Sequence, residues 1–193
     1  MSDETFIRKP NFIFESKSTE FKDMNLGIER MSQAINAMGN PCKKIPAIHI
    51  AGTNGKGSIA AFVNSVLSLV NIKTGVTTSP HLVNWFERIC INKTQISKEE
   101  FQALSLNLDP IAKKYGLTPF EYIICMALKY FNSKEVELLV LEVGLGGRLD
   151  ATTAHKYRPI IAFGAIGLDH CEYLGNSLEK VAIEKAAVIT SKS

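Results

Sequence analysis

The apolar and polar residues of this chain form blocks that alternate between strand-like runs and helical periodicity. Continuous apolar runs and their flanking turn residues predict strands at about 45–51, 73–78, 138–143 and 160–166, the last two covered on both faces. Apolar residues spaced three and four apart predict helices at about 26–38, 57–70 and 177–190. This alternation predicts an α/β fold with a mainly parallel sheet flanked by helices.

Two further helices have clear start signals. Ser97 followed by Glu100 forms a capping-box pattern, so a helix is expected to start at residue 98. Thr118 followed by Pro119 and Glu121 is a stronger example of the same pattern. The helix after Thr118 is expected to bury Phe120, Ile123, Ile124, Ala127, Leu128 and Phe131.

Burial can also be predicted for the helix at 57–70 and the segment that follows the second strand. The segment 79–96 shows no regular pattern, and its Trp85 and Arg88 are expected to be exposed to a ligand. The apolar spacing in the helix is expected to bury Ile59, Phe62, Val63, Val66 and Val70.

The first strand leads into a glycine-rich turn and then a helix. Gly52, Gly55 and Gly57 lack Cβ atoms, so the backbone can fold around an anion and direct N–H groups at it. The helix N-terminus adds positive potential, Lys56 a charge for phosphates, and Ser58 a hydroxyl for Mg²⁺. An ordinary strand–turn–helix corner is the alternative, because Gly57 separates the lysine from the serine. ATP handling is nevertheless the first functional hypothesis.

Three polar residues stand in otherwise apolar patterns. Glu142 interrupts the apolar run at 138–143 near its carboxyl end, where it could bind a metal or cap the following turn. His170 follows the strand at 160–166, and Asp169 could orient it. A structural imidazole is the commoner role for such a histidine.

Lys185 is the most anomalous of the polar residues. It shares a helix face with the apolar stripe Leu178, Val181, Ala182, Ala186 and Ile189, so it points toward the sheet. A lysine whose stem lies along the core edge is the commoner case. The alternatives are a phosphate ligand or a carbamate that binds a metal.

Composition narrows the class of protein. The chain has 193 residues, a net charge of +3 and 21% charged residues, as in a globular domain, and it has no basic cluster with interleaved aromatic residues that would indicate nucleic-acid binding. Its four cysteines form no CxxC pair, which favours reduced thiols in a cytoplasmic protein. The N-terminus does not read as a signal peptide, and the longest apolar stretch contains too many polar residues to span a membrane.

Several motifs together resemble one family. They are AGTNGKGS at 51–58, SPHL at 79–82, ERI at 87–89, LEVGLGGRLDAT at 141–152 and IGLDH at 166–170. This combination resembles folylpolyglutamate synthase and dihydrofolate synthase, of the Mur ligase superfamily. The resemblance extends over nearly all of the chain from about residue 26 onward.

The resemblance implies an ATP- and Mg²⁺-dependent amide ligase. Such an enzyme transfers the γ-phosphate of ATP to the carboxylate of dihydropteroate or a folate, and the amino group of L-glutamate then attacks the acyl phosphate. The fold implied is the P-loop NTPase-like central domain of Mur ligases. The resemblance also implies that the substrates are small molecules, that no nucleic acid or membrane is a partner, and that the intact protein is a monomer.

The resemblance also assigns site residues. It implies catalytic roles for Lys56, Glu142, His170 and Lys185. The metal ions would be bound by Ser58, Glu142 and His170, and also by Lys185 if that lysine is carbamylated. ATP would be held by Gly52, Thr53, Asn54, Gly55, Lys56, Gly57 and Ser58. The folate would lie near Ser79, His81, Arg88, Phe120 and Glu121, although helix capping is a full alternative for Glu121.

Family members are longer than this chain. The resemblance implies a lead-in with a short helix at 1–44 and a truncated ATP-binding domain at 45–193, without the C-terminal glutamate-binding domain. The sheet is then expected to be incomplete on one side, with bare apolar surface. A small-molecule kinase and an ATP-binding module without ligase activity are the alternative functions. The sequence does not distinguish dihydrofolate synthase from folylpolyglutamate synthase or from a protein that does both.

Overall fold

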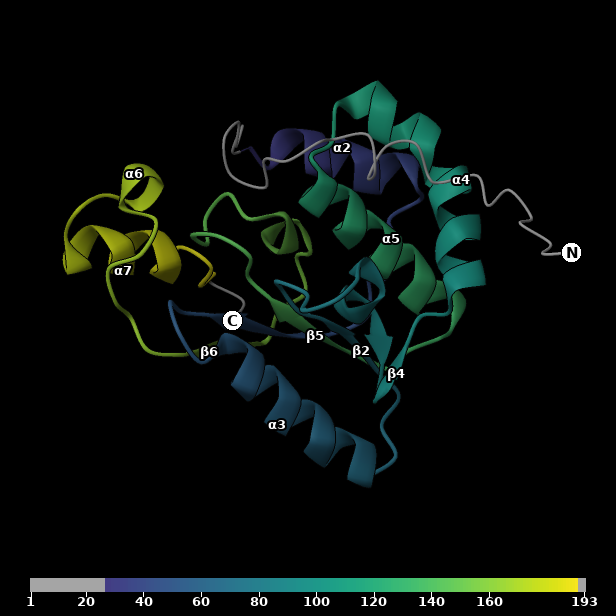
Figure 1. The fold of residues 1–193 in the computed structure, drawn as a ribbon, viewed down its shortest axis with the longest axis horizontal. Coiled ribbons are helices and arrows are strands. Elements are labelled where there is room, and N and C mark those ends of the chain that lie inside the picture. The colour runs from purple at the N-terminus through teal and green to yellow at the C-terminus, as the bar shows by residue number, and fades with distance from the viewer. Residues whose placement is uncertain (1–26, 191–193) are drawn as a thin grey trace, which may run out of the picture.

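The computed structural model describes residues 27–190 and shows a central sheet with helices on both faces (Figure 1). Within these residues the sheet has six strands in the order β4-β3-β2-β5-β1-β6. Strands β2, β5, β1 and β6 are parallel, and β3 and β4 add an antiparallel edge, which confirms the predicted α/β class. The strands are β1 (Ala47–Ala51), β2 (Thr74–Thr77), β3 (Cys90–Ile91), β4 (Thr94–Gln95), β5 (Leu138–Glu142) and β6 (Ile160–Phe163).

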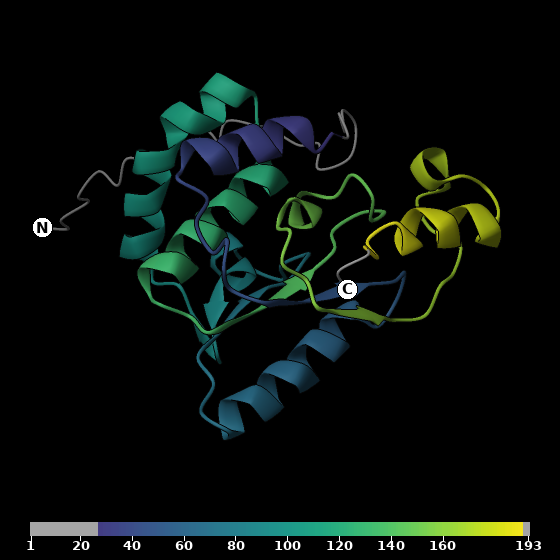
Figure 2. The same cartoon turned by 180° about the vertical axis from the view of Figure 1, so that it is seen from behind.

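The helices divide unequally between the two faces. Helices α2, α4 and α5 lie together over one face, and α3 lies across the other (Figures 1 and 2). Helices α6 and α7 form a separate pair to one side. The helices are α2 (Glu29–Ala37), α3 (Lys56–Leu69), α4 (Lys98–Tyr115), α5 (Pro119–Ser133), α6 (Cys171–Leu174) and α7 (Leu178–Ala186), with 3₁₀ helices η1 (Trp85–Arg88) and η2 (Ala151–Ala154).

The central strand β5 shows how the sheet distributes its side chains. Successive residues of a strand point to opposite faces. Leu139 and Leu141 accordingly join the larger core cluster beneath α5, whereas Val140 joins the smaller cluster beneath α3. The same alternation directs Glu142, the last residue of the strand, toward the α3 side.

Both predicted helix starts are confirmed. The Thr118 hydroxyl accepts a bond from the Glu121 backbone, and the Glu121 carboxylate accepts one from the Thr118 backbone, so α5 has a complete capping box. The Ser97 side chain accepts from Glu100 N at the start of α4. The apolar residues predicted for α5 are buried, except that Phe120 is half-buried.

The burial predicted for α3 is wrong in part. Ile59 and Val63 pack on the sheet as expected, but Phe62, Val66 and Val70 are 75%, 61% and 60% exposed. The helix is apolar around much of its circumference, so spacing alone does not identify the face that meets the sheet. The outer face of α3 is therefore apolar and exposed, whereas bare apolar surface was expected on an incomplete side of the sheet.

The strand predicted at 160–166 is also shorter and less covered than expected. Strand β6 ends at Phe163, and as an edge strand it leaves Ile160 and Phe163 52% and 39% exposed. The apolar run at 138–143 does form a strand covered on both faces, as predicted, but the run at 160–166 does not.

The segment 79–96 is more ordered than predicted. It contains η1 and the β3–β4 hairpin. Trp85 is half-buried and Arg88 is only 4% exposed, which corrects the expectation that both are open to a ligand. Arg88 is buried because its guanidinium carbon lies 4.4 Å from the centre of the Trp85 ring and its Nε donates to His81 Nδ1 at 2.8 Å.

Two class predictions can be compared with the structure. Among the described residues, no helix has the length and apolar character needed to cross a bilayer. All four cysteines are free thiols, as predicted.

Candidate functional site

The glycine-rich turn forms an open loop between β1 and α3. Gly52 and Gly55 have φ values of +138° and +84°, a region that side chains with a Cβ rarely adopt. Gly55 is the N-cap residue of α3, and no side chain caps the helix. The first-turn N–H groups therefore have no side-chain acceptor, and the helix dipole makes this end attractive to an anion.

The loop is held in place by the segment that follows β6. Thr53 N and Asn54 N both donate to Ala165 O, at 2.8 and 3.2 Å, and Ala165 N donates to Asn54 O at 3.1 Å. The Thr53 hydroxyl donates to Gly167 O at 2.9 Å. A Cβ added at Gly164 would lie 2.3 Å from Asn54 O, so this close approach requires glycine. No pattern in the sequence predicted this support.

Lys56 lies beside the loop as predicted for a phosphate ligand. Its Nζ donates to Thr53 O at 3.0 Å, so the ammonium group is folded back over the turn. Ser58, one turn into α3, is exposed. The structure thus places a charge and a hydroxyl at the rim of the same loop.

Glu142 faces this loop, as the strand alternation requires. A Cβ at Gly57 would lie 3.8 Å from Glu142 Oε2, so the carboxylate lies beside the loop backbone. The carboxylate also accepts a bond from Ser79 N at 3.1 Å. Burial raises the pKa of Glu142, while the Ser79 N–H and the nearby Lys56 charge act in the opposite direction. Glu142 therefore caps the segment that follows β2. It does not cap the glycine-rich turn at 144–147, which was the alternative role predicted from the sequence.

Lys185 reaches the loop from α7. The residue is 4% exposed, and its Nζ donates to Gly52 O at 3.0 Å. Burial and the neighbouring Lys56 charge both lower the pKa of Lys185. The predicted inward direction is confirmed, but the buried stripe is Val181, Lys185 and Val188, since Leu178 and Ile189 are each 54% exposed.

His170 begins α6 with a left-handed backbone, φ +48°. Its Nε2 lies 3.5 Å from Asp169 Oδ2, and its backbone N donates to Asp169 Oδ1 at 2.9 Å. Asp169 thus contacts the imidazole as predicted for an orienting carboxylate.

The predicted folate residues fall into two groups. Ser79, His81 and Arg88 lie in the segment after β2, and Ser79 is the one that contacts Glu142. Phe120 lies against the end of β5, because a Cβ at Gly144 would be 2.6 Å from its ring. Glu121 is buried, and Arg30 Nε donates to its two oxygens at 2.9 and 2.8 Å, so the structure shows the capping and ion-pair roles for this residue.

Sequence reasoning missed a buried polar chain beneath the site. Asp150 accepts bonds from Gly144 N, at 2.9 Å, and from the Thr152 hydroxyl. Arg158 Nη1 donates to His49 Nδ1 at 3.3 Å, so Nδ1 is the acceptor nitrogen of the neutral ring. His49 Nε2 therefore carries the proton and donates to Thr152 Oγ1 at 2.8 Å. Burial first, then the Arg158 charge, lowers the pKa of His49 to about 3, so the ring is neutral. The histidine within the apolar run Ile48–Ile50 was the available signal.

The donors at the loop suit a magnesium ion that also binds phosphate. No group of three or more His, Cys, Asp or Glu side chains within residues 27–190 is arranged to hold a metal. Magnesium, however, commonly uses one or two carboxylates together with water and substrate phosphates. Glu142 is a buried carboxylate without a lysine or arginine ion pair among the described residues, so it fits that role.

Comparison with known proteins identifies the family. No family model matches the chain. The dihydrofolate synthetase of Saccharomyces cerevisiae is 40% identical over 171 residues, which cover 86% of this chain and 40% of that protein. The dihydrofolate synthase/folylpolyglutamate synthase of Bacillus subtilis is 40% identical over 171 residues, covering 84% of this chain and 39% of the relative. This chain belongs to the dihydrofolate synthase/folylpolyglutamate synthase family.

Solved structures of the family share the fold. The folylpolyglutamate synthase of Mycobacterium tuberculosis, in complex with ADP and AMPPCP, has a TM-score of 0.81 at 36% identity and covers 86% of this chain and 39% of its own. Escherichia coli FolC in complex with DHPP and ADP has a TM-score of 0.81 at 32% identity, and the match covers 93% of this chain and 42% of the FolC chain. This family member therefore spans about 40% of the length of these two curated relatives and these two solved structures.

Proposed function

We propose that this chain provides the nucleotide-binding part of an ATP-dependent ligase that joins L-glutamate to dihydropteroate, to folates or to both. One observation carries the proposal: an uncapped helix N-terminus, preceded by a left-handed glycine, lies against Lys56 and the buried Glu142. The family relationship supports the particular substrates. We place the protein in the cytoplasm and expect a monomer.

The loop residues would bind the phosphates. The first-turn N–H groups of α3 would donate to a bound anion, and Lys56 needs only to leave Thr53 O to reach it. Glu142 and the Ser58 hydroxyl would hold Mg²⁺, which neutralises phosphate charge when bound. Charge neutralisation and fixed orientation are the main contributions a protein makes to phosphoryl transfer.

The remaining predicted residues would complete the site. Lys185, whose amine loses its proton more readily than usual, supports either a phosphate contact or conversion to a carbamate. His170 would add a ligand for a second metal ion. The acceptor carboxylate would lie between the Ser79 segment and Phe120, so that the acyl phosphate forms within reach of glutamate.

The test compares ADP release under four conditions: ATP and Mg²⁺ alone, with dihydropteroate, with glutamate, and with both. ADP release that needs both substrates supports the ligase. Release that needs dihydropteroate but not glutamate would indicate a kinase. ATP binding in a calorimeter without any release would mean that these residues only bind the nucleotide.

A further inference from the structure

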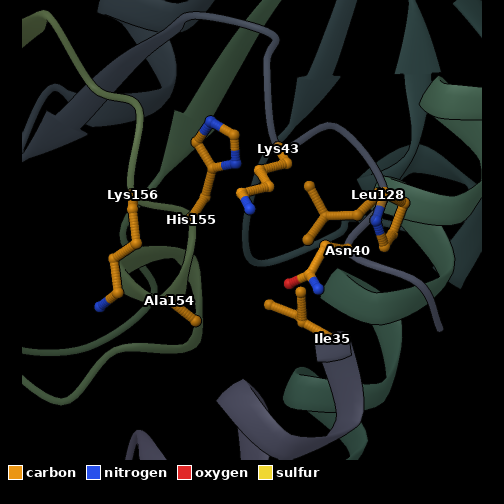
Figure 3. A pocket seen from close by; sticks show the side chains of 8 residues that line it. Ile35, Asn40, Lys43, Leu128, Ala154, His155 and Lys156 are labelled. Atoms are coloured by element: carbon orange, nitrogen blue, oxygen red, sulfur yellow. The ribbon is translucent and has the colours of Figure 1, made fainter. Parts of the chain in front are cut away.

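A hollow lies at the opposite end of β1 from the phosphate loop. It has a volume of about 120 Å³ and lies between the turn after α2, helix α5 and the end of η2 (Figure 3). The turn precedes β1, whereas the phosphate loop follows it, so the length of this five-residue strand, about 17 Å, separates the two sites. The hollow is lined by Ile35, Asn40, Pro41, Lys43, Leu128, Ala154, His155 and Lys156.

The walls combine an apolar base with polar groups at the rim. Ile35, Leu128 and Ala154 belong to the main core and are nearly inaccessible to solvent. Lys43 and Lys156 are exposed. In Figure 3, Lys43 extends between the His155 ring and the Asn40 side chain, and Lys156 lies along the opposite wall.

The hollow is preformed, because its two sides are tied to the core. Cys42, with φ +61°, is fixed by bonds from its N to Asn132 Oδ1 and from its Sγ to Leu128 O, at 3.4 and 3.2 Å. On the other side, His155 Nε2 lies 3.0 Å from Ile45 O. The turn and η2 are therefore held at a fixed separation.

Positive charge accumulates around this hollow without matching acids. Arg158 is 3% exposed; its Nη1 contacts His49, and its Nε has no hydrogen-bond partner. Burial and the charge of Arg158 lower the pKa of Lys156. No carboxylate lines the hollow or pairs with Lys43, Lys156 or Arg158 among residues 27–190. A buried guanidinium without a counter-ion is costly, so an anion nearby would be stabilising.

We propose that this hollow binds a small organic anion, with the anionic group between Lys43 and Lys156 and a flat apolar part on the exposed edges of Ile35 and Ala154. The walls contain no carboxylate ligand for a metal ion, which excludes a divalent cation as the occupant. The proposal concerns a site separate from the nucleotide, and it does not depend on the ligase activity.

The experiment uses amide NMR spectra of the full ¹⁵N-labelled chain. Benzoate and phenyl phosphate are the anionic probes, benzamide is the neutral probe of the same shape, and inorganic phosphate lacks the apolar part. Saturable shifts at Asn40, Lys43 and Leu128 are expected with both organic anions. Benzamide and inorganic phosphate should each bind about tenfold more weakly, since each lacks one of the two interactions.

Matched variants locate the binding. The double variant Lys43→Gln/Lys156→Gln should weaken benzoate binding about tenfold. Lys44→Gln should leave it unchanged, because Lys44 is equally exposed but does not line the hollow. Equal binding by the double variant, shifts confined to residues 52–58, or the absence of saturable shifts in the parent chain would overturn the proposal.

Discussion

Replacing Gly164 by alanine tests how the phosphate loop is supported. The added Cβ would lie 2.3 Å from Asn54 O, and this atom belongs to the backbone, so no side-chain rotation relieves the overlap. The loop must therefore move away from the segment after β6 that carries Gly164. We expect it to lose the bonds that join Thr53 and Asn54 to Ala165.

The magnitude follows from those bonds. Three backbone hydrogen bonds link the loop to Ala165, at 2.8, 3.2 and 3.1 Å. Each contributes about 1 kcal/mol net, so Gly164→Ala should lower the free energy of unfolding by about 3 kcal/mol. For a chain of this size the melting temperature should fall by roughly 6–12 °C.

Gly167→Ala is the matched control. Its Cβ would meet only Thr53 Cγ2, at 3.8 Å, and no positive φ is involved. This variant should change the free energy of unfolding by less than about 0.5 kcal/mol. Urea unfolding followed by circular dichroism gives both values, and amide exchange at Thr53 and Asn54 reports the loop directly. Equal stability of the two variants, with unchanged exchange in Gly164→Ala, would refute the reasoning.

Four further results are expected. Lys56→Ala should weaken ATP binding by roughly 10–100-fold in calorimetry, the value of a charge-assisted hydrogen bond, while Lys44→Ala should not. Glu142→Gln should weaken the Mg²⁺ dependence of ATP binding. Burial raises the folded pKa of Glu142 above its ordinary value of 4.5, so native stability falls as the pH rises above that value, and the variant should gain stability relative to the parent in urea titrations over the same rise. His49 has a folded pKa of about 3 against an ordinary 6.5, so stability should fall as pH drops from 6.5 toward 3, and His49→Gln should flatten that slope. Thr118→Ala should cost about 1 kcal/mol by thermal unfolding, through loss of the α5 cap; no change would show that the cap is dispensable.

The features that could be predicted from the sequence are those that depend on residues close together in the chain. The glycine-rich turn, the capping box at Thr118 and the apolar strands depend on residues within a few positions of one another, and the structure contains them all. The inward direction of Lys185 followed from helical spacing in the same way. Local rules succeed here because backbone geometry alone determines these arrangements.

The missed features depend on residues far apart in the chain. The bond between His49 and Thr152 spans 103 residues, and the support of Thr53 by Gly167 spans 114. Periodicity also failed for α3, since a helix that is apolar on several sides can turn any of them to the sheet. Arg88 was expected to be exposed to a ligand because its segment shows no regular pattern, but stacking on Trp85 and the bond to His81 bury it.

The charge at the phosphate loop argues that Lys185 is more than a packing residue. Lys56 and Lys185 donate to the carbonyls of adjacent residues, Thr53 and Gly52, so two amines share one small region. Their proximity and the burial of Lys185 lower its pKa, which means that the fold holds the charged form at an energetic cost. A leucine would fill the same space without that cost. An arriving phosphate would favour the charged amine, and a carbamate would reverse the charge and attract a metal ion, so either proposed role accounts for an amine at a position where packing alone does not.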